Sequence, residues 1–211
     1  MSKAVVLSIR PKWCEKIASG EKTIEVRKTR PKLQTPFKVY IYCSKAKERL
    51  IYILKDGDEN YGEIYHGKPV FIKRDEGSVC DMWGNRQKVI GEFTCDRIYE
   101  LETRSPGSSY YVKGEGQPTT NDVARQSCLT LKDMHEYLQS KVGYGWDISD
   151  LVIYDESKEL IEFHTWKKCK SCSKSGYEST ACIYDENCMV PVAITKAPQS
   201  WCYVEAMKDA K

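Results

Sequence analysis

The sequence lacks a long apolar stretch, and it carries only a small excess of positive charge. No segment approaches the ~18 consecutive apolar residues of a membrane-spanning helix. The first residues also lack the apolar core of a secretory signal peptide. The net charge is +3 and the isoelectric point is about 8.2, whereas dedicated nucleic-acid domains typically exceed a pI of about 9. These absences predict a cytoplasmic protein for which nucleic-acid binding is permitted but not required.

Apolar residues are nevertheless numerous enough for a sizeable core. Hydrophobic residues make up 41% of the chain and aromatic residues 11%, which excludes global disorder. No internal repeat is visible. The length of 211 residues predicts a single domain over residues 1–211, with insertions at about 45–85 and 165–192.

Strand patterns with a period of two dominate the sequence. The predicted strands cover residues 5–9, 23–27, 37–43, 89–99, 151–154 and 197–204. Helices are expected from Pro11 to about residue 19, closed by Gly20, and again from about Thr130. A further short helix is expected near 46–54. Residues 103–122 are predicted to form a loop, and the glycine-rich residues 143–150 a turn.

The most informative motif is G-x-K-x-x-E-x-R, formed by Gly20, Lys22, Glu25 and Arg27. On a strand, Thr23, Glu25 and Arg27 lie on one face, and Lys22 sits at the corner between helix and strand. One interpretation is a solvated charged surface of little energetic value. The other is a site that offers a donor fork, a point cation and a carboxylate to a ligand.

Together with Leu-Ser-Ile-Arg-Pro at 7–11, this motif resembles the signature of the ASCH family, within the PUA-like superfamily of small β-barrels. The resemblance implies an α+β fold, a PUA-like β-barrel with peripheral helices, and a ligand cleft floored by the motif. Glu92 follows Gly91 in a run that resembles the central strand of the family, which passes close to the site. Members of the superfamily commonly bind RNA or modified bases.

Other residues are candidates to extend the site. Arg10 and Lys12 flank the start of the first helix and could meet a phosphate together with its free amides, or be solvated surface cations. Trp146 follows two glycines, which suggests an exposed loop where its ring could stack on a base. Core packing is the alternative role for this tryptophan.

The ten cysteines are unevenly distributed. Four of them form the pattern C-x2-C-x9-C-x5-C in a segment without apolar periodicity, and they are Cys169, Cys172, Cys182 and Cys188. A structural zinc ion held by four thiolates would stabilise such a segment. An iron–sulfur cluster, a redox-active pair, unligated thiols, or His164 in place of one cysteine are the alternatives.

Three functions follow from these observations. The first is binding of RNA or a nucleotide, with Lys22, Arg27 and Arg10 on phosphate or a base edge and Glu25 as an acceptor. The second is hydrolysis of RNA or a modified nucleoside. The resemblance to acylcytidine amidohydrolases implies Lys22 as a catalytic residue, but Glu25 stands where those enzymes carry a threonine nucleophile, so that Thr23 would have to substitute. Alternatively, Lys22 and Glu25 could act as a cation and a general base in an attack on phosphate or amide. The third is a protein-interaction module that uses the cysteine-rich segment.

Overall fold

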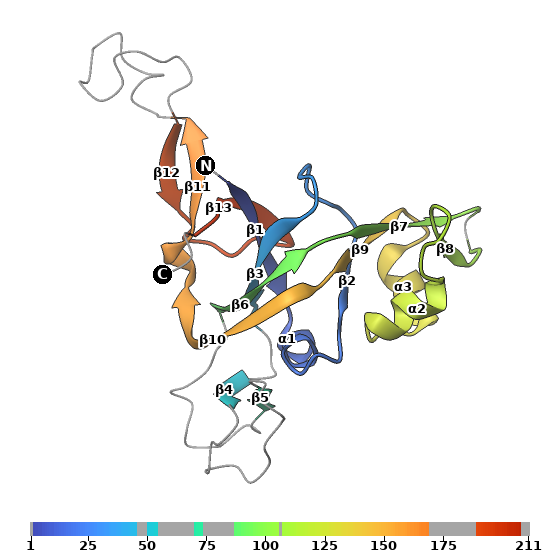
Figure 1. Ribbon diagram of the computed structural model, residues 1–211, viewed down its shortest axis with the longest axis horizontal. Helices are drawn as coiled ribbons and strands as arrows, with labels where there is room; N and C mark the ends of the chain where they lie inside the picture. The colour runs from blue at the N-terminus through green and yellow to red at the C-terminus, as the bar shows by residue number, and fades with distance from the viewer. Residues whose placement is uncertain are drawn as a thin grey trace.

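The fold is dominated by β-sheet, with helices at the periphery, as the computed structural model in Figure 1 shows. The structure describes residues 2–45, 50–54, 70–73, 87–105, 107–168 and 189–207. Within these ranges the strands form a five-stranded sheet, a four-stranded sheet and two separate hairpins. The predicted α+β class is confirmed. None of the helices in the described ranges is long and apolar enough to cross a bilayer.

The five-stranded sheet contains both ends of the described chain. In spatial order its strands are β10 (Ser149–Glu159), β6 (Lys88–Cys95), β3 (Phe37–Cys43), β1 (Lys3–Ile9) and β13 (Trp201–Glu205). β1 and β3 are parallel, and the other neighbours are antiparallel. The parallel pair requires a crossover, which helix α1 (Pro11–Ala18) and β2 provide. The predicted closing strand near the C-terminus is confirmed, because β13 pairs with β1.

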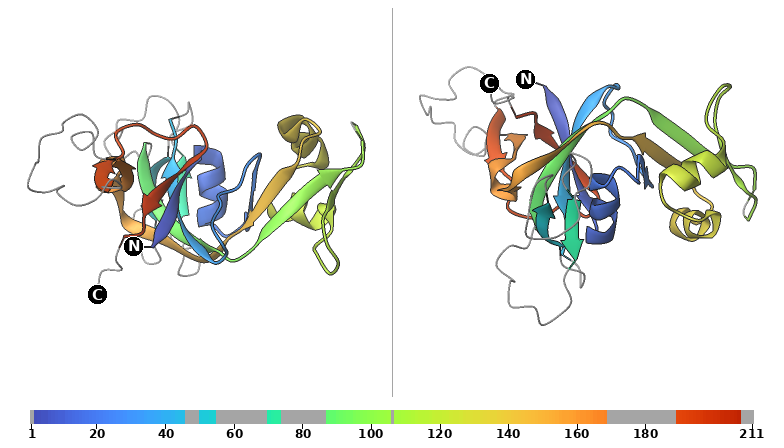
Figure 2. Two further views of the ribbon diagram at one scale, coloured as in Figure 1. Left: turned by 90° about the horizontal axis from the view of Figure 1, so that it is seen from above. Right: turned by 60° about the horizontal axis from the view of Figure 1, so that its bottom comes forward.

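The second sheet projects from the first as an arm. Its strands, in spatial order, are β2 (Ile24–Arg27), β9 (Gly143–Asp147), β7 (Ile98–Thr103) and β8 (Tyr110–Val112). β6 leads directly into β7, and β9 into β10, so these two strand pairs pass from one sheet into the other (Figure 2). The arm also carries helices α2 (Thr120–Gln126) and α3 (Leu131–Leu138) (Figure 1).

Both faces of the five-stranded sheet are buried. Val5, Leu7 and Ile41 face α1 and the second sheet, while Val6 and Tyr40 face the opposite side. On that side lie the short helix η3 (Leu160–Glu162) and the hairpin of β11 (His164–Lys168) and β12 (Met189–Ala193). Burial on both faces explains why residues 4–7 form a continuous apolar run instead of an alternating pattern.

Three predictions about local structure are wrong. Residues 50–54 form strand β4 (Leu50–Leu54), which pairs with β5 (Val70–Lys73), because a run of aliphatic and aromatic residues suits a strand better than a helix. The predicted loop 103–122 contains β8 and the start of α2, and the predicted turn at 143–150 contains β9. The proposed insertions at 45–85 and 165–192 lie largely outside the described residues.

Candidate functional site

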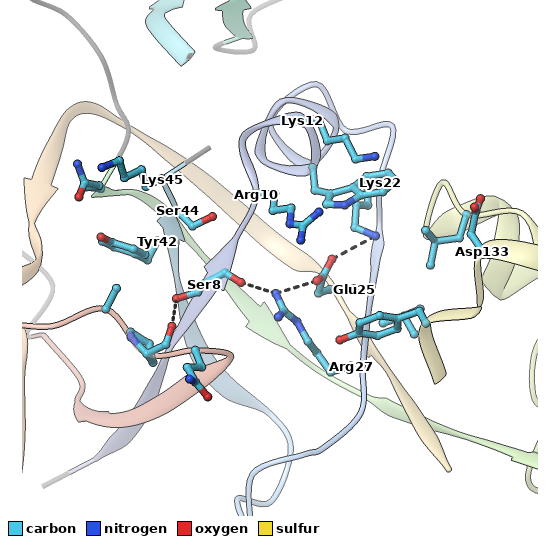
Figure 3. Close-up of a pocket in the computed structure, with 18 residues that line it drawn as sticks. Ser8, Arg10, Lys12, Lys22, Glu25, Arg27, Tyr42, Ser44, Lys45 and Asp133 are labelled. Atoms are coloured by element: carbon cyan, nitrogen blue, oxygen red, sulfur yellow. Dashed lines mark hydrogen bonds and ion pairs between the residues drawn. The ribbon is translucent and has the colours of Figure 1, made fainter. Parts of the chain in front are cut away.

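The charged motif on β2 lies along a cavity of about 610 Å³, which we call the motif cavity (Figure 3). β1 and the start of α1 form one wall, β2 forms the floor, and residues at α3 form the far wall. The chain reaches β2 by a tight turn at Gly20, where φ is 76°, a conformation that glycine adopts without strain. The helix, the glycine and the strand therefore place the motif as the sequence predicts.

Glu25 is the centre of a buried ion triad. Its Oε1 lies 2.9 Å from Nη2 of Arg27, and its Oε2 lies 3.1 Å from Nζ of Lys22. All three residues are less than a tenth exposed. Burying charge is costly unless each charge has a partner, and here each carboxylate oxygen has one. The carboxylate therefore organises the two cations.

Backbone carbonyl groups fix the two cations further. Nζ of Lys22 donates to the carbonyl oxygen of Ser127 at 2.7 Å, and it lies 5.1 Å from the ring centroid of Trp13. Nη2 of Arg27 donates to the carbonyl oxygen of Ser8 at 2.6 Å. These bonds tie β2 to β1 and to the segment after α2, so the triad also joins separate parts of the fold.

Arg27 also carries an unpaired donor. Its Nε is buried and has no hydrogen-bond partner among the described residues. Leaving a buried donor unpaired costs about 1–3 kcal/mol, and unpaired groups of this kind are rare in native proteins. Because Arg27 lines the motif cavity, an acceptor atom of a ligand could satisfy this donor.

A second group of cations lies at the mouth of the motif cavity and consists of Arg10, Lys12 and Lys45 (Figure 3). All three are exposed, and none forms an ion pair with a described residue. Lys12 instead places its Nζ 4.4 Å from the ring centroid of Trp13, a cation–π contact. The mouth therefore carries positive charge that the triad does not neutralise.

The far wall belongs to α3, which sequence reasoning did not connect with the site. Leu129, Asp133 and Tyr137 line the motif cavity, and their spacing of four residues places them along one side of the helix and its start. Oδ2 of Asp133 accepts hydrogen bonds from Oγ1 and N of Thr130 at 2.7 and 3.0 Å, and these bonds lower the pKa of the carboxyl group. Burial raises the pKa of the Tyr137 hydroxyl, and the nearby Arg27 guanidinium opposes that effect. The wall thus offers a carboxylate and a protonated phenol.

The comparison with known families agrees with this geometry. The family model of the ASCH domain matches residues 7–93, a stretch that begins within β1 and contains α1, the motif strand and β3. This stretch is therefore similar to the ASCH domain family. The far wall at α3 lies beyond the matched stretch, so it is a contribution from the rest of this chain to the motif cavity.

Similar structures have been solved for a bacterial protein. The chain is similar to the crystal structure of ASCH from Zymomonas mobilis and to those of two mutant proteins of that ASCH. Each match has 14% sequence identity and a TM-score of 0.43, and covers 74% of this chain and 73–76% of the other. No curated protein matches the sequence.

Three predicted site residues do not line the motif cavity. Thr23 precedes β2, and its hydroxyl donates to the side chain of Gln126 at 3.4 Å. Glu92 lies on another face of the sheet, where it pairs with Lys38 at 2.8 Å. Trp146 is fully buried in β9, in contact with Phe37 at a ring-centroid distance of 5.9 Å. The prediction of an exposed stacking tryptophan is therefore wrong, because a ring inside the core is not accessible to a base.

The predicted zinc ligands Cys169, Cys172, Cys182 and Cys188 all lie outside the described residues. Within the described ranges, no group of histidine, cysteine and acidic side chains could hold a metal ion. His164, the alternative ligand, is the first residue of β11. The zinc site stays a prediction from the spacing of the cysteines.

Proposed function

We propose that the motif cavity binds a nucleotide, either free or as part of a single-stranded RNA. The observation that carries this proposal is the distribution of charge in the cavity. The carboxylate of Glu25 is matched by Lys22 and Arg27. The exposed cations at the mouth, Arg10, Lys12 and Lys45, outnumber the one further carboxylate that lines the cavity, Asp133. That arrangement suits an anionic ligand such as a phosphate group.

Size and shape also support a ligand of nucleotide dimensions. A volume of about 610 Å³ lies inside the range of about 300–1,000 Å³ that is usual for small-molecule sites. Trp13 and Tyr137 contribute aromatic surface to the walls, and aromatic rings are the usual platforms for unstacked bases. A duplex is too large for this cavity, whereas a single nucleotide or an RNA end fits its volume.

The proposal predicts salt-dependent RNA binding. Affinity for a short single-stranded RNA should fall as the KCl concentration rises, because the cations at the mouth displace counterions from phosphates. Fluorescence anisotropy over a KCl series measures the slope, and Arg10→Gln should reduce that slope by about one. The matched control is Lys132→Gln, an exposed lysine of α3 that does not line the cavity. Affinity that is indifferent to salt would contradict the proposal.

Hydrolysis of a modified nucleoside or of RNA is the second candidate. It is favoured by Lys22 and Glu25, which line the same cavity 3.1 Å apart and could act as cation and general base. Thr23 is not a suitable nucleophile, because it does not line the cavity. Incubation with N4-acetylcytidine and with RNA distinguishes the two candidates: turnover that disappears in Lys22→Ala supports hydrolysis, and its absence with both substrates rejects it.

A further inference from the structure

We infer that α3 selects the base of the bound nucleotide, and that Asp133 favours a base with an exocyclic amino group. The inference rests on the proposed function. The inference goes beyond the proposed function because it names a specificity-determining residue outside the stretch that matches the ASCH family model, which ends at residue 93. Two features of the cavity lead to this assignment: the position of its free carboxylate oxygen and the arrangement of the charges around it.

Asp133 is the carboxylate that a ligand can reach. Glu25 is buried, and both of its oxygens are engaged by cations of the protein. Asp133 is exposed at the rim, and only its Oδ2 takes part in the capping bonds with Thr130. Its Oδ1 accepts no hydrogen bond from a described residue. An ionised carboxylate is an acceptor only, so this oxygen can accept from an amino group but repels a keto oxygen.

The charges orient the ligand in the cavity. Figure 3 shows Lys45 and Asp133 on opposite sides of the cavity, with Arg10 between them. A phosphate is attracted by Arg10 and Lys45 and repelled by Asp133. The phosphate therefore lies toward the mouth cations, and the base lies against α3, where the ring of Tyr137 provides an apolar surface.

The unpaired Nε of Arg27 complements this arrangement without providing selectivity. It is a buried donor on the floor of the cavity, and every base carries ring or carbonyl acceptors that could receive it. A contact with this donor would therefore not distinguish one base from another. Discrimination between amino and keto bases depends on Asp133.

The chain contains a matched control for Asp133. On α2, Oδ2 of Asp122 accepts from Oγ1 and N of Thr119 at 2.7 and 3.1 Å, almost the same capping box as on α3. Asp122 does not line the cavity, and it additionally pairs with Arg125 at 3.2 Å. Replacing either aspartate by asparagine therefore disturbs a helix cap, but only the change at Asp133 alters the cavity.

The test compares pairs of nucleotides that differ at one substituent. Calorimetry gives the Kd values of CMP and UMP, and of AMP and IMP, for the wild type, Asp133→Asn and Asp122→Asn. We expect the wild type to bind CMP about tenfold more tightly than UMP, the effect of about one charge-assisted hydrogen bond, and to prefer AMP over IMP. Asp133→Asn should bring both ratios close to one, because asparagine can also donate to a keto oxygen. Asp122→Asn should leave both ratios unchanged.

The informative quantity is the ratio of the two Kd values within each pair. Removing a negative charge strengthens the binding of every nucleotide phosphate equally, so this effect cancels in the ratio. Equal wild-type affinity for amino and keto partners, or a preference that survives Asp133→Asn, overturns the inference and leaves nucleotide binding intact. If the wild type binds none of the four nucleotides and no short single-stranded RNA, both the proposed function and this inference are overturned.

Discussion

The motif cavity contains two groups of cations that differ in burial and in ion pairing. Lys22 and Arg27 are buried, and each pairs with Glu25 and donates to a backbone carbonyl group. Arg10 and Lys12 are exposed and form no ion pair with a described residue. The first pair is held by the fold, whereas the second is available to a ligand.

The main role of the charged motif is therefore to stabilise the fold. Its central carboxylate and two cations link β1, β2 and the segment after α2 through one buried network. The ligand-facing chemistry comes from residues around the network: the mouth cations, the ring of Trp13 and the wall at α3. Changes to the buried triad of Lys22, Glu25 and Arg27 should therefore affect stability most. Changes to the cations at the mouth should mainly affect binding.

The largest expected effect on stability follows from Glu25→Gln. This change leaves two buried cations without a counter-charge, which costs about 3–5 kcal/mol of unfolding free energy. Urea denaturation monitored by tryptophan fluorescence measures the loss. Glu21→Gln is the control, because the Lys16–Glu21 pair is much more exposed and should contribute less than about 1 kcal/mol. Equal losses of unfolding free energy in the two variants would refute the conclusion that the buried triad stabilises the fold more than an exposed ion pair does.

A smaller effect is expected from the cap of α3. Thr130→Ala removes the side-chain acceptor for N of Asp133 and should cost about 1 kcal/mol. Thr119→Ala on α2 should cost a similar amount, because its capping box has nearly the same geometry. Thermal denaturation gives both values. If Thr130→Ala cost as much as Glu25→Gln, stability would depend on the rim as strongly as on the buried triad.

The inner part of the site could be predicted from the sequence because it is local. Pro11, Gly20 and the alternation of β2 define a helix, a turn and a strand within seventeen residues, and local geometry then fixes the motif. The burial of Glu25 could not be predicted in this way. It depends on the carbonyl group of Ser127, which lies more than a hundred residues from Lys22 in the chain.

The glycines near Trp146 show why the sequence does not reveal the burial of this residue or the wall at α3. In the sequence, Gly143 and Gly145 indicate a turn or an exposed loop, but in the structure they permit close packing within a strand. A Cβ on Gly143 would lie 2.5 Å from Cδ1 of Leu138, and one on Gly145 would lie 3.1 Å from Cγ2 of Ile24. Glycine at a close approach and glycine in a turn look alike in a sequence. The resulting strand buries Trp146 and lets α3 pack close to β9.

The most direct test of the account measures binding and stability in the double variant Arg10→Gln/Lys12→Gln. CMP affinity is measured by calorimetry, and the free energy of unfolding by urea denaturation. We expect the affinity for CMP to fall at least tenfold, because two charge-assisted contacts are lost. The free energy of unfolding should change by less than about 0.5 kcal/mol, as for exposed positions in general. Wild-type affinity in this variant would contradict the central claim that the exposed cations bind the ligand.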